Sequence, residues 1–123
     1  MSKFDDGLAV RKAVLGAEFV DKAIASADEF NRPLQELVTE YCWGAIWTRE
    51  GLLRRVRSML NLAMLTALNR PHELKMHVQG ALRNGVTREE IREVLLQATI
   101  YAGVPAGVDA FRVAREAMAD FKE

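Results

Sequence analysis

The residues best suited to acid–base chemistry are Glu73 and His77, which lie four positions apart in the segment PHELKMHVQGALRNG. Residues at this spacing share one face of an α-helix, so the carboxylate would lie beside the imidazole. A histidine titrates near neutral pH, and a neighbouring carboxylate can orient its ring for proton transfer. The same spacing is also typical of a solvated surface pair, and the spacing alone leaves both interpretations open.

The helix that must hold this pair has recognisable boundaries. Pro71 is suited to the first turn of a helix, and Gly85 is suited to the position just after its end. Thr87 and Glu90 have the spacing of a capping box, which predicts that the next helix begins there. We therefore expect Glu73 and His77 on a short helix that is followed closely by another.

The rest of the chain also has a helical pattern. Apolar residues recur every three or four positions, and no sustained two-residue alternation appears, which predicts an all-α fold. A length of 123 residues fits a single domain over residues 1–123, with six to seven helices. The expected helices span about 6–15, 18–27, 33–47, 52–68, 71–85, 87–102 and 106–121.

Two of these helices have distinctive apolar faces. In the helix that begins at Pro33, the spacing predicts a core stripe formed by Leu34, Leu37, Val38, Tyr41 and Cys42. The second half of the helix over 52–68 is apolar nearly all round, which predicts burial on most sides. A subunit this small cannot easily supply that cover, so we expect a homo-oligomer, with a compact Met-rich monomer as the alternative.

Three further sets of side chains could line a binding pocket. Arg54 and Arg57 share a helical face and could grip a carboxylate, although a solvated basic face explains them equally well. Trp43 and Trp47 stack along one face and could either wall a small pocket or lie in the core. Cys42 has no evident activating base, which favours a small buried hydrophobe over a nucleophile.

Composition and motifs disfavour several classes of partner and cofactor. The 17 basic and 17 acidic side chains cancel, so neither nucleic acid nor a membrane surface is expected. With one cysteine, no signal-peptide pattern and no apolar run of roughly 18 residues, the sequence favours a cytoplasmic protein. His72, Glu73 and His77 lack the HExxH spacing, and there is no glycine-rich phosphate loop or CxxC motif. We therefore expect no metal and no cofactor.

Three segments carry a recognisable pattern over most of the chain. They are LLRRVRSMLNLAMLTALNRPHELKMHVQGALRNGVTREEIREVLLQATIYAGVPAGVDAFRVA, ELVTEYCWGAIWTREGL upstream of it, and RKAVLGAEFVDKA near the N-terminus. Together they resemble the carboxymuconolactone decarboxylase family. The resemblance implies an alkylhydroperoxidase D-like, all-α subunit that assembles into a ring-like homo-oligomer, a trimer or a hexamer, without a cofactor.

The peroxidases of this fold differ from the chain at their reactive positions. They carry a glutamate, a CxxC motif and a histidine four residues after the second cysteine. His77 matches that histidine, but Arg70 and Glu73 occupy the cysteine positions and Ser58 occupies the glutamate position. Peroxide reduction by a thiol pair is therefore not expected, and the chain is more similar to the decarboxylases of the family.

The resemblance implies a carboxy-lyase that converts 4-carboxymuconolactone to 3-oxoadipate enol-lactone in protocatechuate catabolism (the beta-ketoadipate pathway). Its partner would be a small dicarboxylate lactone, with His77 as proton donor or oxyanion partner and Glu73 orienting it. The residues assigned to substrate binding are Arg54, Arg57, Trp47, Cys42 and Ser58. Two alternatives remain: an enzyme of the same fold acting on another small carboxylate or lactone, and a non-catalytic helical assembly module.

Overall fold

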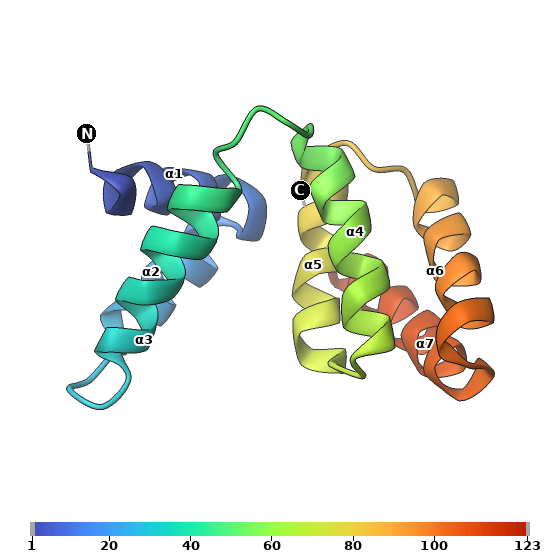
Figure 1. Cartoon of the computed structure of the whole chain (residues 1–123). Helices are drawn as coiled ribbons and strands as arrows, with labels where there is room; N and C mark the ends of the chain where they lie inside the picture. The colour runs from blue at the N-terminus through green and yellow to red at the C-terminus, as the bar shows by residue number, and fades with distance from the viewer. Residues whose placement is uncertain (1, 123) are drawn as a thin grey trace. The chain divides into compact units, whose positions relative to one another are not determined.

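The computed structural model describes residues 2–122, which form seven α-helices and one π-helical segment, with no strand (Figure 1). This confirms the prediction of an all-α chain with about seven helices. The elements are α1 (Lys3–Leu15), α2 (Ala17–Ala25), α3 (Arg32–Leu37), the π-helical η1 (Val38–Ile46), α4 (Arg54–Ala67), α5 (Pro71–Arg83), α6 (Arg88–Ala102) and α7 (Val104–Asp120). Over the described residues, no helix has both the length and the apolar character that a membrane crossing needs.

Contacts group the chain into two compact units. One extends up to Leu52 and contains the elements from α1 to η1, and the other begins at Leu53 and contains α4 to α7. The assignment of one domain to residues 1–123 stays a prediction. Each unit has its own helix packing. Some of the candidate site residues predicted from the sequence lie in one unit, and the others lie in the second unit.

In the N-terminal unit, α1 packs directly against η1. Two glycines allow the helices to pack this closely. A Cβ atom on Gly7 would lie only 2.1 Å from the backbone oxygen of Thr39. A Cβ atom on Gly44 would lie only 2.3 Å from the backbone oxygen of Lys3. No other residue type permits so close an approach of two backbones. The packing of the N-terminal unit therefore depends on the absence of a side chain at two positions that are distant in sequence.

The helix predicted over 33–47 changes its winding at Val38. Pro33 lies in the first turn of α3 as expected, but η1 is a π-helix, and the Trp47 amide donates to the Cys42 carbonyl five residues back (3.1 Å). This wider winding changes which positions share a face. The predicted core stripe is wrong, because Leu34 and Leu37 of α3 are exposed, and so are Tyr41 and Cys42 of η1. The buried positions are Thr39, Trp43, Gly44 and Trp47.

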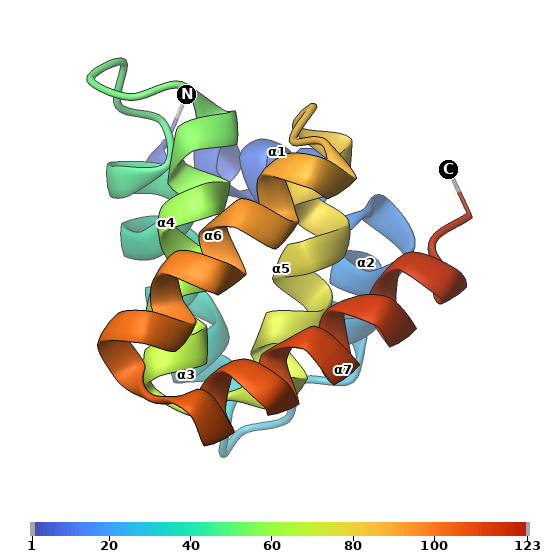
Figure 2. The ribbon, with the colours of Figure 1, turned by 90° about the vertical axis from the view of Figure 1, so that its right-hand side faces the viewer.

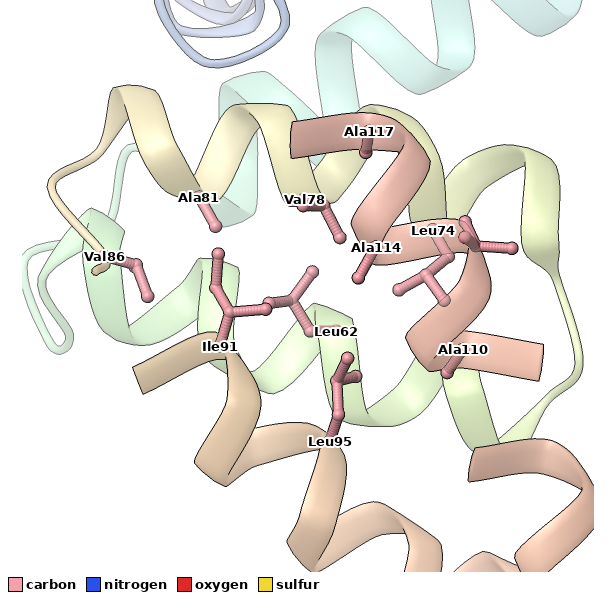
Figure 3. Close-up of a cluster of buried hydrophobic side chains, with 11 residues drawn as sticks. Leu62, Leu74, Val78, Ala81, Val86, Ile91, Leu95, Ala110, Ala114 and Ala117 are labelled. Carbon is pink, nitrogen blue, oxygen red and sulfur yellow. The ribbon is translucent and has the colours of Figure 1, made fainter. Parts of the chain in front are cut away.

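The C-terminal unit is a closed arrangement of four helices. Helix α4 packs against both α5 and α6, and α7 packs against the same two helices, as the second view makes visible (Figure 2). Their buried side chains point toward one another in a single cluster (Figure 3). Larger side chains come from α4, α5 and α6, whereas α7 contributes mainly alanines, which let that helix approach closely. The cluster is Leu62, Leu74, Val78, Ala81, Val86, Ile91, Leu95, Ala110, Val113, Ala114 and Ala117.

The boundaries of α5 follow the sequence signals. Pro71 occupies its first turn, and Gly85 follows its end with a positive φ of 87°. The Val86 amide donates to the Ala81 carbonyl (2.9 Å) and the Gly85 amide to the Leu82 carbonyl (3.1 Å), which together form a Schellman motif. Val86 and Ala81 also belong to the core cluster, so the end of α5 is fixed by both hydrogen bonds and packing.

The start of α6 confirms the predicted capping box. The Thr87 hydroxyl accepts from the Glu90 amide (3.0 Å), and the Glu90 carboxylate accepts from the Thr87 amide (3.0 Å). The same carboxylate accepts from Nη2 of Arg55 on α4, at 2.6 Å from Oε2, and these interactions hold the pKa of Glu90 below its usual value. Glu90 therefore starts α6 and ties it to α4 at the same time.

Two helices begin at least two residues earlier than the sequence predicted. Helix α1 begins at Lys3 rather than near Asp6, because the Ser2 hydroxyl accepts from the Asp5 amide (3.1 Å) and caps the helix. Helix α7 begins at Val104 rather than Ala106. Its proline falls in the first helical turn, where the missing amide hydrogen costs no intrahelical bond.

Within this chain the second half of α4 is buried on one side only, so the burial on most sides that the sequence predicts would need a second surface. Leu60, Met64 and Leu68 are 47%, 51% and 62% exposed in this chain. The inward face of α4 contributes Leu62 to the core, and the opposite face remains apolar and uncovered. An apolar face of this kind is the physical basis for expecting association with a second surface.

Candidate functional site

Helix α5 holds Glu73 and His77 one turn apart. Their sequence neighbours Leu74 and Val78 are fully buried in the core cluster, which fixes the rotation of the helix about its axis. Glu73 and His77 lie beside that buried stripe and are both half-buried, and Nδ1 of His77 is itself buried. The pair therefore occupies a defined face of α5.

The environment of His77 favours the neutral imidazole. Burial lowers the pKa of His77 to about 4, and the attraction of Glu73 only partly opposes this shift. At pH 7 the ring is therefore uncharged, and it can donate one hydrogen bond and accept another. The sequence left two roles open for His77, proton donor and oxyanion partner. The neutral ring favours the second role, because it is suited to stabilise a developing oxyanion by hydrogen bonding rather than to act as a stored cationic acid.

The lowered pKa can be measured directly by NMR. The chain has two histidines, and His72 is exposed, so a His72→Asn variant leaves His77 as the single imidazole. We expect the ring signals of His77 in that variant to titrate with a midpoint near pH 4. A midpoint near 6.5, the value of an unperturbed histidine, would contradict the burial argument.

The same shift predicts an acid-dependent loss of stability. Since the folded chain binds a proton at His77 less readily than the unfolded chain, the neutral ring contributes stability fully above pH 6.5. That contribution is lost as the pH falls from about 6.5 to about 4, and its size is on the order of 3 kcal/mol. Unfolding in denaturant across this pH range should show the decline, and a His77→Phe variant should show much less of it.

Helix α4 carries the other predicted polar residues of the C-terminal unit. Ser58 is fully buried, and its hydroxyl oxygen accepts a hydrogen bond from Nδ2 of Asn84 (2.9 Å). Arg57 is half-buried, with a buried Nε, whereas Arg54 is exposed at the start of the helix. Of the two arginines, Arg57 is therefore the better placed to meet a ligand in a desolvated site. Sequence reasoning did not single out Asn84, which is the C-cap residue of α5.

The C-terminal unit also contains an apolar groove between α4 and α6, with a volume of about 610 Å³. Its lining residues are Arg55, Val56, Met59, Leu60, Ala63, Glu89, Glu90, Glu93, Val94 and Gln97. Neither Glu73 nor His77 lines this groove. It is therefore a surface feature separate from the predicted catalytic pair, and its apolar floor includes the exposed face of α4.

The N-terminal unit holds the two predicted residues Trp47 and Cys42. The rings of Trp43 and Trp47 stack with centroids 4.8 Å apart and an interplanar angle of 23°, as their spacing predicted. Cys42 is exposed, so its interpretation as a buried hydrophobe is wrong. Local desolvation raises the pKa of the Cys42 thiol more than the positive charge of Arg11 lowers it, and the group is therefore a thiol rather than a thiolate at neutral pH.

Arg11 is a buried charge that the sequence reasoning missed. It is 6% exposed, and its Nη1 donates to Oε1 of Gln35 and to Oγ1 of Thr39, both at 3.0 Å. A signal was present in the sequence, because Arg11 shares a helical face with Gly7 and Val14 and so falls on the apolar side of α1. Across residues 2–122, no three His, Cys, Asp or Glu side chains come together as a metal site.

The amino-acid sequence matches one known protein family over most of its length. Residues 32–116 match the Carboxymuconolactone decarboxylase family. The chain is 45% identical to a nitrosuccinic acid decarboxylase of Metarhizium robertsii, over 95% of this chain and 82% of that protein. It is 38% identical to a 4-carboxymuconolactone decarboxylase of Acinetobacter baylyi, over 96% of this chain and 88% of that protein. Both similarities extend over nearly the whole chain.

Proposed function

Because the chain belongs to the carboxymuconolactone decarboxylase family, we propose that it is a carboxy-lyase that removes carbon dioxide from a small dicarboxylate without a cofactor. 4-Carboxymuconolactone is the first candidate substrate. Nitrosuccinate is the second, and the 45% identity to a nitrosuccinic acid decarboxylase favours it. The observation that carries the proposal is that two relatives aligned over nearly the full chain are both decarboxylases.

The two candidate substrates share a skeleton. In each, one carbon bears the departing carboxylate, an acetate arm and an electron-withdrawing group, so both are substituted succinates. In the lactone, the electron pair released on breaking the carbon–carbon bond moves through the ring double bond onto the lactone carbonyl oxygen. In nitrosuccinate, the pair moves onto the nitro oxygens. Both reactions then end when a proton adds to carbon, so one site could support either.

The shared chemistry defines what the protein must supply. It must hold the carboxylate that stays, surround the departing carboxylate with an apolar wall, and stabilise the oxygen on which charge develops. A neutral His77 can donate its ring hydrogen to that oxygen, and the lowered pKa keeps the ring in this form at pH 7. In the proposal, Glu73 orients the ring and Arg57 holds a carboxylate.

The other residues that the sequence assigned to substrate binding have less structural support. Arg54 is exposed, and the Ser58 hydroxyl already accepts from Asn84. Trp47 and Cys42 belong to the N-terminal unit, and their place in the substrate pocket stays a prediction. We assign the oxyanion function to His77 on α5 and the carboxylate grip to Arg57 on α4.

We also propose that the chain forms a homo-oligomer. The uncovered apolar face of α4 and the groove beside it support this, as do Ile100 and Tyr101 at the end of α6, which are 78% and 84% exposed. Apolar surface of this extent is typical of a protein–protein interface. Sedimentation velocity across a range of concentrations measures the assembly, and a monomer at every concentration would contradict the proposal.

The proposed activity can be tested with both substrates in parallel. The purified chain is incubated with 4-carboxymuconolactone or nitrosuccinate in deuterated water, and carbon dioxide release and product NMR spectra are recorded. We expect release from one or both substrates, with one deuterium on the carbon that is protonated. Absence of release from both would overturn the assignment to succinate-type substrates. A preference of about tenfold or more in kcat/KM would identify the better substrate.

A further inference from the structure

The charge of Arg11 is poorly compensated within the structure. Arg11 is 6% exposed, and it lies in the segment RKAVLGAEFVDKA, to which the proposed function assigns no role. Its two hydrogen bonds go to the neutral acceptors Gln35 and Thr39. Among the described residues it forms no ion pair with Asp or Glu, and its buried Nε has no hydrogen-bond partner.

An isolated buried charge is costly to a folded protein. Burial without a counter-ion lowers the pKa of Arg11, but a guanidinium keeps its proton at any physiological pH. The nearby Cys42 does not supply the missing negative charge, because its own pKa is raised and it stays a neutral thiol. The structure therefore contains a fixed cation whose natural complement is an anion from outside the chain.

The geometry of the guanidinium specifies how that anion would bind. Both hydrogen bonds come from Nη1, and they fix the plane of the group against Gln35 and Thr39. This leaves the edge formed by Nε and Nη2, whose two parallel N–H groups match the two oxygens of a carboxylate. Thr39 lies on the π-helical η1, and such wide turns occur frequently at functional sites.

From this arrangement we propose that Arg11 is the receptor for a carboxylate of a small dicarboxylate ligand, bound through the Nε and Nη2 edge of its guanidinium. The choice of a dicarboxylate rests on the proposed function, whereas the anion site itself rests on the environment of Arg11. The carboxylate could belong to the substrate or to a separate regulatory anion, and the experiments below distinguish the two.

The first experiment uses the unmodified chain and its single cysteine as a reporter. Alkylation of Cys42 by iodoacetamide is followed by mass spectrometry with and without succinate. A carboxylate on Arg11 cancels the positive charge that lowers the pKa of the thiol, so we expect alkylation at pH 8 to slow about fivefold or more. Dimethyl succinate, which is uncharged, should have no effect, and chloride at the same ionic strength should have little. Equal rates with succinate and with chloride would overturn the proposal.

The second experiment tests Arg11 itself. In an Arg11→Gln variant we expect succinate to lose its effect on alkylation, whereas a matched change of an exposed charge, Lys22→Gln, should preserve it. Arg11→Lys keeps the positive charge but lacks the two parallel N–H donors of the guanidinium. We expect it to weaken succinate binding by about tenfold. Tryptophan fluorescence checks the folding of each variant. If a variant fails to fold, the alkylation of Cys42 in the unmodified chain still tests the proposal.

Kinetics then separate the two sources of carboxylate. If Arg11 binds the substrate, the Arg11→Lys substitution raises KM more than it changes kcat. If Arg11 binds a separate anion, succinate changes the rate of decarboxylation without competing with the substrate. Succinate protection without carbon dioxide release would leave the anion site standing and overturn the proposed function. Decarboxylation with an unchanged KM in Arg11→Lys and no protection by succinate would overturn the anion site alone.

Discussion

Replacing His77 with Ala is expected to lower kcat for decarboxylation by about 10²- to 10³-fold, with a smaller change in KM. The reason is that the proposed hydrogen bond from the neutral ring strengthens only as charge develops on the substrate oxygen, so its loss affects the transition state more than binding. Steady-state rates of carbon dioxide release measure the effect. His77→Gln keeps a hydrogen-bond donor at this position and should retain more activity than His77→Ala.

His72 provides a matched control for this prediction. It lies on the same helix, five residues before His77, and it is exposed. His72→Ala should leave kcat within about twofold, because its side chain is exposed and has no role in the proposed site. Full activity in His77→Ala would remove His77 from the mechanism.

The pH dependence of kcat distinguishes the two roles that the sequence left open. A neutral donor with a pKa of about 4 predicts a kcat that is constant from pH 5 to pH 8 and that changes only near pH 4. A cationic acid with the same pKa would instead give a rate that rises about tenfold for each unit of decrease in pH across that range. A rising profile would therefore favour direct proton donation.

Replacing Gly7 with Ala should destabilise the N-terminal unit by about 2 kcal/mol or more. The new Cβ would lie 2.1 Å from the Thr39 oxygen and 2.6 Å from the Gly44 nitrogen, both backbone atoms that cannot move independently of η1. Forced overpacking of this kind costs about 1 to 3 kcal/mol or more, and it outweighs the gain of about 1 kcal/mol in helix propensity. Gly44→Ala should have a similar effect, because its Cβ would meet the Lys3 oxygen at 2.3 Å.

The two tryptophans make this prediction measurable within one unit. Both Trp residues of the chain lie before Leu52, so intrinsic fluorescence during denaturant unfolding reports on the N-terminal unit. Gly51→Ala is the matched control, because a Cβ there meets nothing within 4 Å. We expect it to shift the midpoint very little, and an equal shift in Gly7→Ala and Gly51→Ala would contradict the close-packing argument.

Features governed by local chemistry were predictable from the sequence. Pro71, Gly85 and the capping box of Thr87 and Glu90 bound their helices as expected, because each acts on the hydrogen bonds of its immediate neighbours. The stacking of Trp43 and Trp47 also follows from a four-residue spacing. Ser2 was overlooked as a cap, although the signal was of the same local kind.

Features governed by tertiary packing were not predictable in this way. The buried face of η1 depends on the contact between Gly7 and Gly44, which are far apart in sequence. It also depends on a π-helical winding that no residue pattern predicted. The pKa of His77 depends on how deeply its ring is buried, and the spacing from Glu73 cannot supply that information. For Arg11 the pattern placed a charge on an apolar face, but only the structure shows its neutral partners.

The hydrogen bond between Asn84 and Ser58 has a consequence for the chemical ageing of the protein. Asn84 precedes Gly85, and asparagine followed by glycine is prone to deamidation, in which the glycine nitrogen attacks the side-chain amide and ammonia leaves. In the folded chain the Gly85 nitrogen donates to the Leu82 carbonyl, which holds it away from this attack. The unfolded chain lacks that protection.

Deamidation at this site would convert the Nδ2 donor into a carboxylate oxygen facing the fully buried Ser58 hydroxyl. The iso-aspartate product would also add a backbone carbon to the motif that ends α5. Repeated partial unfolding during storage should therefore produce molecules one dalton heavier that refold with a loosened junction between α4 and α5.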